Sequence, residues 1–358
     1  MPTIEPLTHR AAWTPQALSA ASEAWNYRWT DDDIAELDQA LQLVTRSGLV
    51  VPRITREQFP IPGVMSRLAP FKHELELGLG VLYLKGLPVE RYTKDQASVI
   101  FWGLGMHFGR PWEQNLRGHL LGDVINEGKS LDDPSARGYQ TTASLEMHTD
   151  GADAVGLLCL KQAPEGGENQ IVSALAVYNQ LARTNPEVLQ RLLDTEWCMD
   201  WRGEEAPGTP PYHRGTIFSR TPRGMTCLAL TGYIYSAQRY EDVPRLGDSD
   251  REAIETFRRT SEDPELVVRF RQSAGDMLFL NNHFHMHGRS TFVDADDPRE
   301  RRHLRRLWLE SESWSGSRPR AMQEILENAR QYWAKPDSPV QMWDQPGCPD
   351  GTRSGCQT

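Results

Sequence analysis

Residues 275–289 read GDMLFLNNHFHMHGR, an apolar run that leads into three alternating histidines. The apolar residues Met277–Leu280 follow a Gly-Asp turn signal, which predicts a short strand. His283, His285 and His287 are spaced by two, so a regular strand would point all three to one face. Spacing alone therefore leaves open which of the three binds a ligand.

A second segment, His148-Thr149-Asp150, carries an imidazole and a carboxylate on alternate residues. Alternate side chains of a strand share a face, so both groups would aim at one point. A later histidine would complete two histidines and one carboxylate, the facial triad of a non-heme Fe(II) oxygenase. The competing interpretation is a surface turn or a buried hydrogen-bonded pair, because such triplets also occur by chance.

The composition limits the class of protein. The net charge of -10 over 358 residues argues against a surface for nucleic acid or anionic membranes. The longest apolar runs are far shorter than the roughly 20 residues of a membrane span, and no secretory signal is visible. The five cysteines lack Cys-x-x-Cys spacing, which favours a reducing, cytoplasmic location. We expect no nucleic-acid or membrane partner, and a homo-oligomer stays open.

The order of predicted elements indicates a single catalytic domain over residues 1–358, mainly β with flanking helices (α+β). Residues 1–78 form an N-terminal helical part, with a helix at Thr30–Val44 that begins on a capping box. Residues 79–315 hold short strands between Gly and Pro turns, with inserted helices, which is typical of a sandwich or barrel. Residues 316–358 hold a C-terminal helix and tail. The predicted core strands are Gly80–Gly86, Leu120–Ile125, Leu145–Asp150, Val155–Leu160, Gln170–Ser173, Thr216–Ser219, Met225–Leu230, Leu266–Arg271, Met277–Leu280 and His303–Glu310.

Four features of the chain resemble the taurine dioxygenase (TauD/TfdA) family of Fe(II)/2-oxoglutarate-dependent dioxygenases, which includes clavaminate synthase-like enzymes. They are His148-x-Asp150, Gly166-Gly167, the segment Gly275–Arg289 in which four residues separate Asn281-Asn282 from His287, and the arginine-rich run Arg301–Leu309. They occur in the family's order and cover roughly residues 80–310. A lone His-x-Asp is a weak signal, whereas the four features together are specific.

The resemblance implies a double-stranded β-helix (jelly-roll, cupin-like) core with Fe(II) held by His148, Asp150 and His287. It also implies 2-oxoglutarate and O2 as cosubstrates, and hydroxylation of a C–H bond of a small-molecule substrate with release of succinate and CO2. On this interpretation His283 and His285 line the pocket or form hydrogen bonds nearby. The carboxylate of Asp150 argues against a halogenase, which needs an open position for halide at that place.

The arginine-rich run matters because the far carboxylate of 2-oxoglutarate suits the two-pronged geometry of arginine. Arg302 and Arg306 are four apart, so on a strand they would face the same side with Leu304 between them. Matching to the family assigns Arg302 to 2-oxoglutarate and Arg306 to the substrate or the same carboxylate, although the two roles could be exchanged. The family's hydroxyl donor after Gly-Gly is replaced by Asn169, which can still donate a hydrogen bond.

The substrate side is less defined, and a small amino acid or carboxylated metabolite is favoured because Arg306 could pair with an anion. Further candidates for substrate contact are Gln114, Asn115, Ser144, Tyr233 and His285. Desaturation, cyclisation or epoxidation in secondary metabolism would use the same iron site. A cupin-like oxygenase that takes no 2-oxoglutarate and a catalytically silent metal-binding protein of the same fold are further alternatives. A nucleic-acid-modifying dioxygenase is disfavoured by the charge.

Overall fold

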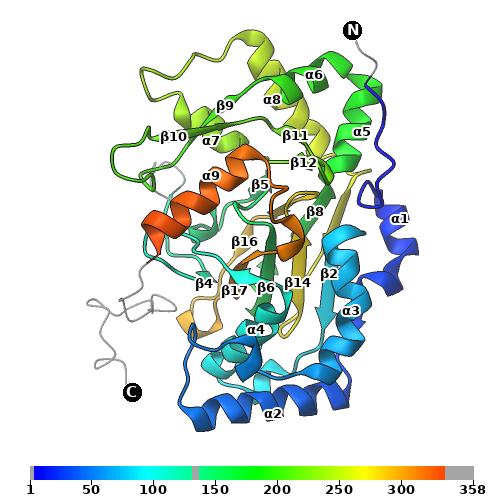
Figure 1. Ribbon diagram of the computed structural model, residues 1–358, viewed down its shortest axis with the longest axis vertical. Helices are drawn as coiled ribbons and strands as arrows, with labels where there is room; N and C mark the ends of the chain where they lie inside the picture. The colour runs from blue at the N-terminus through cyan, green and yellow to red at the C-terminus, as the bar shows by residue number, and fades with distance from the viewer. Residues whose placement is uncertain (1–3, 131–136, 335–358) are drawn as a thin grey trace.

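Two β-sheets form the centre of the chain (Figure 1), in a computed structural model that describes residues 4–130 and 137–334. Within these residues the major sheet has seven strands in the order β1-β2-β14-β6-β17-β3, and β4 pairs with β17. They are β1 (Asn26–Arg28), β2 (Val81–Lys85), β3 (Arg110–Pro111), β4 (Leu121–Val124), β6 (Ala154–Lys161), β14 (Met277–Asn281) and β17 (His303–Glu310). The minor sheet, in the order β13-β8-β15-β5, contains β5 (Leu145–His148), β8 (Asn169–Ser173), β13 (Val267–Phe270) and β15 (His285–Arg289).

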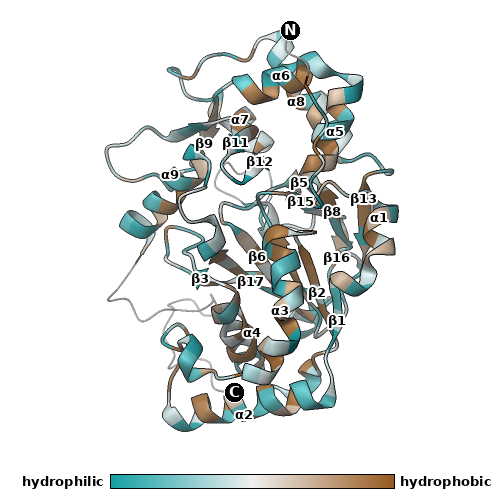
Figure 2. Cartoon of the chain, turned by 45° about the vertical axis from the view of Figure 1, so that its right-hand side comes forward, coloured by the Kyte–Doolittle hydropathy of each residue, from teal (hydrophilic) through white to brown (hydrophobic). Residues whose placement is uncertain are grey.

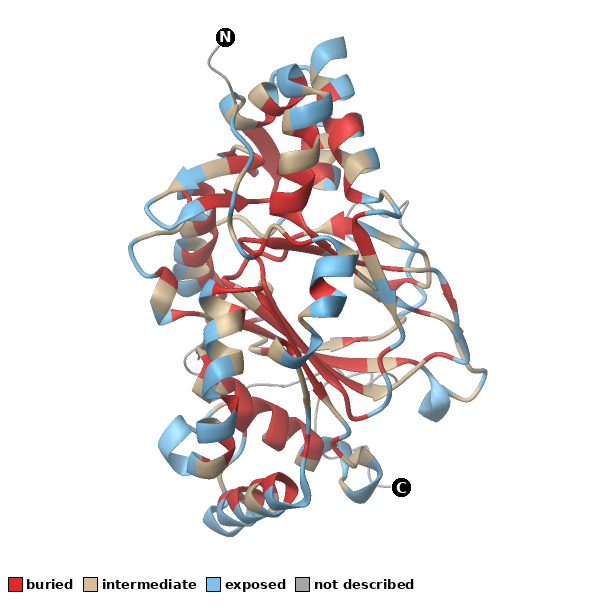
Figure 3. Ribbon diagram, turned by 90° about the vertical axis from the view of Figure 1, so that its right-hand side faces the viewer, coloured by how far each residue is buried: buried red, intermediate tan, exposed pale blue. Residues whose placement is uncertain are grey.

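The central strands β2, β14, β6 and β17 of the major sheet are largely buried (Figure 3). Their alternate residues belong to different apolar layers. Along β14, Leu278 and Leu280 share an apolar cluster with Met286 of the minor sheet. Met277 and Phe279 point the other way and pack with the N-terminal helices. Because side chains alternate across a strand, one apolar run fills both layers. The layer between the two sheets is the one that surrounds the candidate site.

Helices α3 (Pro62–Leu77) and α4 (Lys94–Phe108) cover the outer face of the major sheet, and α2 (Asp31–Ser47) packs against both of them. Helix α2 begins on a capping box, in which Thr30 and Asp33 each accept a hydrogen bond from the other's backbone N–H. Figure 2 shows hydrophobic residues along the central strands and hydrophilic residues on the solvent side of these helices. Among the described residues, no helix is long and apolar enough to cross a bilayer.

A second group of elements lies between β8 and β13 in the chain and stands at the other end of the molecule (Figure 1). It contains α5 (Ala174–Thr184), α6 (Pro186–Asp194), β9 (Trp197–Asp200), β10 (Tyr212–Gly215), β11 (Phe218–Thr221), β12 (Gly224–Cys227), α7 (Thr231–Ala237) and α8 (Asp248–Ser261). The remaining elements are α1 (Pro15–Ala20), β7 (Glu165–Gly166), β16 (Phe292–Val293) and α9 (Arg320–Asn328). The helices of this group pack outside the β-core, as the sequence predicted.

The predicted fold class is confirmed, with differences in detail. The N-terminal part is not wholly helical, because Asn26–Arg28 adds a parallel strand to the edge of the major sheet beside β2. The strand predicted at Leu145–Asp150 ends at His148, so Asp150 lies in the turn that follows. The single strand predicted at Thr216–Ser219 is wrong, since two strands flank a break at residues 216–217. Hydrophobic alternation is too short there to locate the break.

The position of Gly275, two residues before β14, accepts no larger residue without strain. Gly275 has a φ of +88°, and a Cβ placed there would lie 1.8 Å from the carbonyl oxygen of Leu87. We expect Gly275→Ala to lower the free energy of unfolding by about 2–5 kcal/mol, from left-handed strain and overpacking together. Gly203 is the matched control, because its φ of +82° is similar but no atom lies within 4 Å of its Cβ position.

Urea unfolding of both variants measures the difference. Gly203→Ala should lower the free energy of unfolding only by the strain contribution, about 1–2 kcal/mol. Equal losses in the two variants would show that the contact with Leu87 contributes nothing.

Candidate metal centre

His148 and His287 face each other across neighbouring strands. His287 on β15 is the direct cross-strand partner of His148 at the end of β5. Their ring centroids are 4.4 Å apart. The Nδ1 of His148 donates a hydrogen bond of 2.8 Å to the carbonyl oxygen of Glu146, which leaves Nε2 as the ring's lone-pair nitrogen. This arrangement of one bonded and one open nitrogen is usual for a metal-binding histidine.

Asp150 completes the group from the turn after β5. Its Oδ2 lies 3.7 Å from Nε2 of His287 and is buried without a hydrogen-bond partner among the described residues. One ligand atom from each of His148, Asp150 and His287 lies within 4.8 Å of the other two. Two imidazoles and one carboxylate that converge on one point fit the donor set of a non-heme Fe(II) site.

The turn that carries Asp150 is held by its neighbours in space. Thr149 donates a backbone hydrogen bond of 3.2 Å to the carbonyl oxygen of Ala229, and the N–H of Ala229 donates back to Oγ1 of Thr149 at 3.0 Å. This double contact fixes the turn to the segment that leads into α7. The position of Asp150 therefore depends on contacts from outside β5, the strand that precedes it.

The protonation states of the three groups suit a divalent cation. Burial lowers the pKa of His148, and it lowers the pKa of His287 to about 3. Burial would raise the pKa of Asp150, but the positive charge of Arg306 and the contacts with the two histidines bring it below its usual value. Neutral imidazoles and an ionised carboxylate are the forms that bind a metal without first releasing protons.

The other two histidines of the downstream segment point elsewhere. Nε2 of His283 lies 2.9 Å from Oδ1 of Asp153, and its ring stacks on Trp314 with centroids 3.7 Å apart. His285 stacks on Trp13 at 5.2 Å, and its Nδ1 donates to the carbonyl oxygen of Asn281 at 3.2 Å. The alternation that left three candidates open thus brings only His287 into the metal-binding group of the described residues.

The buried neutral histidines predict how the stability of the folded protein changes with pH. Burial lowers the pKa of His213 to about 4, below the value of about 6.5 in an unfolded chain. Between these values the unfolded state binds one more proton, so stability falls as the pH falls, by about 1.4 kcal/mol per pH unit. Urea unfolding of the metal-free protein between pH 6 and 4.5 should show a steeper fall in stability than this, because the buried His148 and His287 contribute in the same direction. His213→Gln should make the slope shallower by that amount, and an unchanged slope would contradict the assignment.

Arg306 lies beside the metal-binding group. Its Nε donates to Oε1 of Gln114 at 2.8 Å, and its Nη1 lies 3.4 Å from Oδ1 of Asp150. The rings of Tyr139 and Trp308 lie near the guanidinium, with centroids 5.2 and 5.0 Å from its central carbon. Nη2 has no hydrogen-bond partner among the described residues. One edge of the cation is therefore held, and the other can meet an anion.

Arg302 is placed differently from Arg306. It precedes β17, is 2% exposed, and its Nε donates to Oε1 of Gln162 at 3.2 Å. No carboxylate of the described residues forms an ion pair with its guanidinium, and burial lowers its pKa to about 10. Arg289, two residues after His287, is also buried and shares the ring of Phe292 with Arg302. Two buried cations without ion-pair partners among the described residues favour an anionic ligand nearby.

The remaining predicted contacts fall into two groups. Gln114 and Asn169 lie close to the arginines: Gln114 bonds Arg306, and Asn169 is the cross-strand partner of Arg289 while its amide donates to Gln272 at 3.0 Å. The other four are placed without a contact to the triad. Asn115 accepts a hydrogen bond from the backbone N–H of His119, and the side chain of Ser144 is exposed. The ring of Tyr233 lies under Arg202, and His285 packs on Trp13.

Three neighbours of the arginines were not singled out for the site by the sequence. Gln162 holds Arg302, and Tyr139 and Trp308 flank Arg306. Trp308 could have been found, because it lies two residues after Arg306 on the same strand. Tyr139 and Gln162 lie outside strands, where no periodicity marks the residues that face the site.

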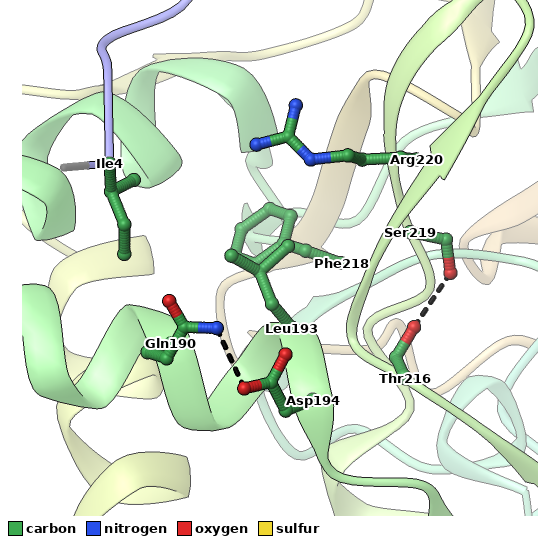
Figure 4. A pocket seen from close by; sticks show the side chains of 8 residues that line it. All are labelled: Ile4, Gln190, Leu193, Asp194, Thr216, Phe218, Ser219 and Arg220. Atoms are coloured by element: carbon green, nitrogen blue, oxygen red, sulfur yellow. Dashed lines mark hydrogen bonds between the residues drawn. The ribbon is translucent and has the colours of Figure 1, made fainter. Parts of the chain in front are cut away.

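A cavity of about 480 Å³ lies away from the metal-binding group, between α6 and β11 (Figure 4). Its lining residues are Ile4, Gln190, Leu193, Asp194, Thr216, Phe218, Ser219 and Arg220. Gln190 is bonded to Asp194 and Thr216 to Ser219, each at 2.7 Å, as the dashed lines in Figure 4 show. Four polar side chains of the lining therefore bond one another, and Arg220 takes no part in these bonds.

Comparison with known proteins identifies the family. The model for the "Taurine catabolism dioxygenase TauD, TfdA family" matches residues 46–308. The chain belongs to this family. It is 32% identical over 318 residues to FR-33289 synthase of Streptomyces rubellomurinus, covering 86% of this chain and 91% of that protein. This TauD, TfdA family dioxygenase is also 28% identical to uridine-5'-phosphate dioxygenase of an Amycolatopsis species over 182 residues, 49% of this chain and 64% of that one.

Solved structures support the fold of the TauD, TfdA family member. Asparagine oxygenase in complex with Fe(II), 2S,3S-3-hydroxyasparagine and succinate matches with a TM-score of 0.60 and 14% identity, over 80% of this chain and 93% of that chain. The non-heme iron oxygenase OrfP in complex with Fe and alpha-ketoglutaric acid matches with a TM-score of 0.58 and 16% identity, over 80% and 94% of the two chains. At these identities the likeness concerns the fold, and it agrees with the predicted jelly-roll core.

Proposed function

We propose that this dioxygenase uses Fe(II), 2-oxoglutarate and O2 to oxidise an unactivated C–H bond of a small anionic metabolite, most simply by hydroxylation. The observation that carries the proposal is the convergence of His148, Asp150 and His287 beside the unpaired edge of Arg306. Family membership supplies the reaction class, and the charges around the triad favour the substrate class. The buried, unpaired cysteines Cys159, Cys198 and Cys227 suit the cytoplasmic location proposed from the sequence.

The three triad residues would hold the iron. The Nε2 of His148 and the buried Oδ2 of Asp150 are open in the described residues, and the imidazole of His287 lies beside both. Iron held there would supply, with 2-oxoglutarate and O2, the oxidising power for C–H cleavage, and the 2-oxoglutarate would be converted to succinate and CO2. Asp150 contributes the negative charge that the cation needs, and Arg306 keeps this carboxylate ionised and oriented.

Arg302 and Arg306 would bind different anions, 2-oxoglutarate and the substrate respectively. Arg302 is buried, oriented by Gln162, and unpaired among the described residues, which suits the far carboxylate of 2-oxoglutarate. Asn169 begins the strand beside Arg289 and would add a polar contact. Arg306 lies directly at Asp150 and would orient the substrate by its anionic group, while Tyr139 and Trp308 shield this ion pair from water. A buried ion pair of this kind fixes orientation as well as affinity.

The substrate class follows from this position of Arg306. A carboxylate- or amino-acid-like molecule would place its anion on Nη2 and its nearest carbons toward the triad. Solved structures of the same fold hold molecules of this class, since the asparagine oxygenase complex contains a hydroxyasparagine and an OrfP complex contains a hydroxy-L-arginine. Desaturation, cyclisation and epoxidation need the same residues and differ only in how the substrate carbons are placed.

The proposal is tested without knowing the substrate. Purified protein is mixed anaerobically with Fe(II) and 2-oxoglutarate, and the weak visible band of the iron chelate is recorded. The wild type should show the band and His148→Ala should not. Absence of the band in the wild type would overturn the proposal. Succinate release is then screened over amino acids and organic acids, and stimulation by an anionic compound should disappear in Arg306→Met.

A further inference from the structure

The position of Asp150 is not explained by the strand that precedes it. Strand β5 ends at His148, and strand β6 begins at Ala154, so Asp150 belongs to the turn between them. Strand alternation fixes a side chain only within the strand. Another part of the chain must therefore set the distance between the carboxylate of Asp150 and the imidazole of His287.

Asn282 makes three contacts with this turn. The backbone N–H of Asp150 donates to Oδ1 of Asn282 at 3.4 Å, and Nδ2 of Asn282 donates to the carbonyl oxygen of Ala152 at 2.9 Å. The backbone N–H of Asn282 donates to the carbonyl oxygen of Asp153, also at 2.9 Å. Asn282 is fully buried and lies between β14 and β15, five residues before His287. Asn282 thus connects the turn that carries Asp150 to the segment that leads into β15, the strand of His287.

The chemistry of the contacts explains the residue type. The side chain must accept one hydrogen bond and donate another at once, which an amide does and a carboxylate does not. An aspartate at this position would set its charge against the carbonyl oxygen of Ala152 and close to Asp150. An alanine would leave the backbone groups of the turn without partners in a buried place, where an unsatisfied group is costly.

The far end of the same turn is held by charge. The carboxylate of Asp153 accepts hydrogen bonds from Nη2 of Arg318 at 2.7 Å and from the backbone N–H of Ser311 at 2.9 Å. His283, one residue after Asn282, contacts the same carboxylate at 2.9 Å. The turn is therefore held at Asp153 by charge, at Thr149 by its bonds to Ala229, and at Asp150 and Ala152 by the side chain of Asn282.

We propose that Asn282 is a positioning residue of the iron site, which sets the geometry between Asp150 and His287 without touching the metal. The inference rests on the proposed function, because it assumes that the triad holds Fe(II). Residues that orient metal ligands typically change metal affinity about 10- to 100-fold when they are replaced. We expect that loss in Asn282→Ala, together with a shifted or weakened band of the Fe(II)–2-oxoglutarate chelate.

Asn281, the last residue of β14 and the neighbour of Asn282, provides a matched control. It is also a buried asparagine, but its Nδ2 donates to the carbonyl oxygens of Leu75 and Glu76 at 3.2 and 3.1 Å, at the end of helix α3. Asn281→Ala should lower the melting temperature and leave the affinity for Fe(II) near that of the wild type. A purely structural role of Asn282 would make the two variants alike.

The experiment is an anaerobic Fe(II) titration of the full chain, followed by addition of 2-oxoglutarate, with melting temperatures measured alongside. Weaker binding in Asn282→Ala but not in Asn281→Ala supports the inference. Fe(II) affinity within twofold of the wild type in Asn282→Ala, or equal losses in both variants, overturns it. If the alanine variant does not fold, Asn282→Asp takes its place, because it keeps the size of the side chain but cannot donate to the carbonyl oxygen of Ala152. Weaker Fe(II) binding in Asn282→Asp supports the inference, and Fe(II) affinity within twofold of the wild type overturns it. A wild type that binds no Fe(II) overturns the proposed function itself.

Discussion

Replacing His287 with alanine is expected to abolish tight Fe(II) binding and turnover, whereas replacing His285 leaves Fe(II) binding intact. His287 lies 3.7 Å from Asp150 and directly across from His148, so its loss removes one of three ligands. His285 stacks on Trp13 outside this group. A residue that only orients a ligand costs about 10- to 100-fold in metal affinity, so the loss of a ligand should exceed 100-fold.

Anaerobic Fe(II) titration measures this contrast, and the two variants control for each other because both remove a buried imidazole. The His285 variant should be less stable to urea, since its ring fills space against Gly80 as well as Trp13. Retention of Fe(II) binding in His287→Ala together with its loss in His285→Ala would reassign the third ligand.

Arg302→Met is expected to weaken 2-oxoglutarate binding roughly 30-fold or more, while Arg306→Met changes it little. Removing one partner of a buried, hydrogen-bonded charge pair costs about 2–5 kcal/mol, and about 1.4 kcal/mol corresponds to tenfold. Arg302 is buried and has no ion-pair partner among the described residues, which leaves its charge for the cosubstrate. The dissociation constant of 2-oxoglutarate is read from the visible band of the iron chelate.

A 2-oxo acid that lacks the far carboxylate separates this effect from general damage to the site. 2-Oxovalerate should bind the wild type and Arg302→Met with similar, weak affinity, because it has no group for Arg302 to meet. Loss of 2-oxoglutarate binding in Arg306→Met, with Arg302→Met unaffected, would exchange the two roles.

The core of the fold could be predicted because its strands are apolar, short and closed by turns. The run Met277–Leu280 became β14, and His303–Glu310 became β17 with the predicted bounds. The histidines of the triad were marked by alternation together with the order of motifs, since alternation alone fitted His283 and His285 equally well. Local periodicity specifies which residues share a face, and long-range packing decides which face meets the partner strand.

The loop residues could not be placed from the sequence, for a physical reason. Gln114 was predicted to contact the substrate, and both ends of its amide are bonded within the chain, to Arg306 and to the carbonyl oxygen of Leu120. Asn115 was expected beside it, and its side chain instead closes the turn to His119. Asparagine and glutamine bond backbone and side chains alike, so their residue type does not reveal which partner they take.

The paired hydrogen bonds between Thr149 and Ala229 have a consequence for changing what the enzyme accepts. The same backbone segment continues into α7, which carries Tyr233, so a redesigned α7 would pull on the turn that holds Asp150. Grafting a foreign α7 would therefore trade selectivity against iron retention.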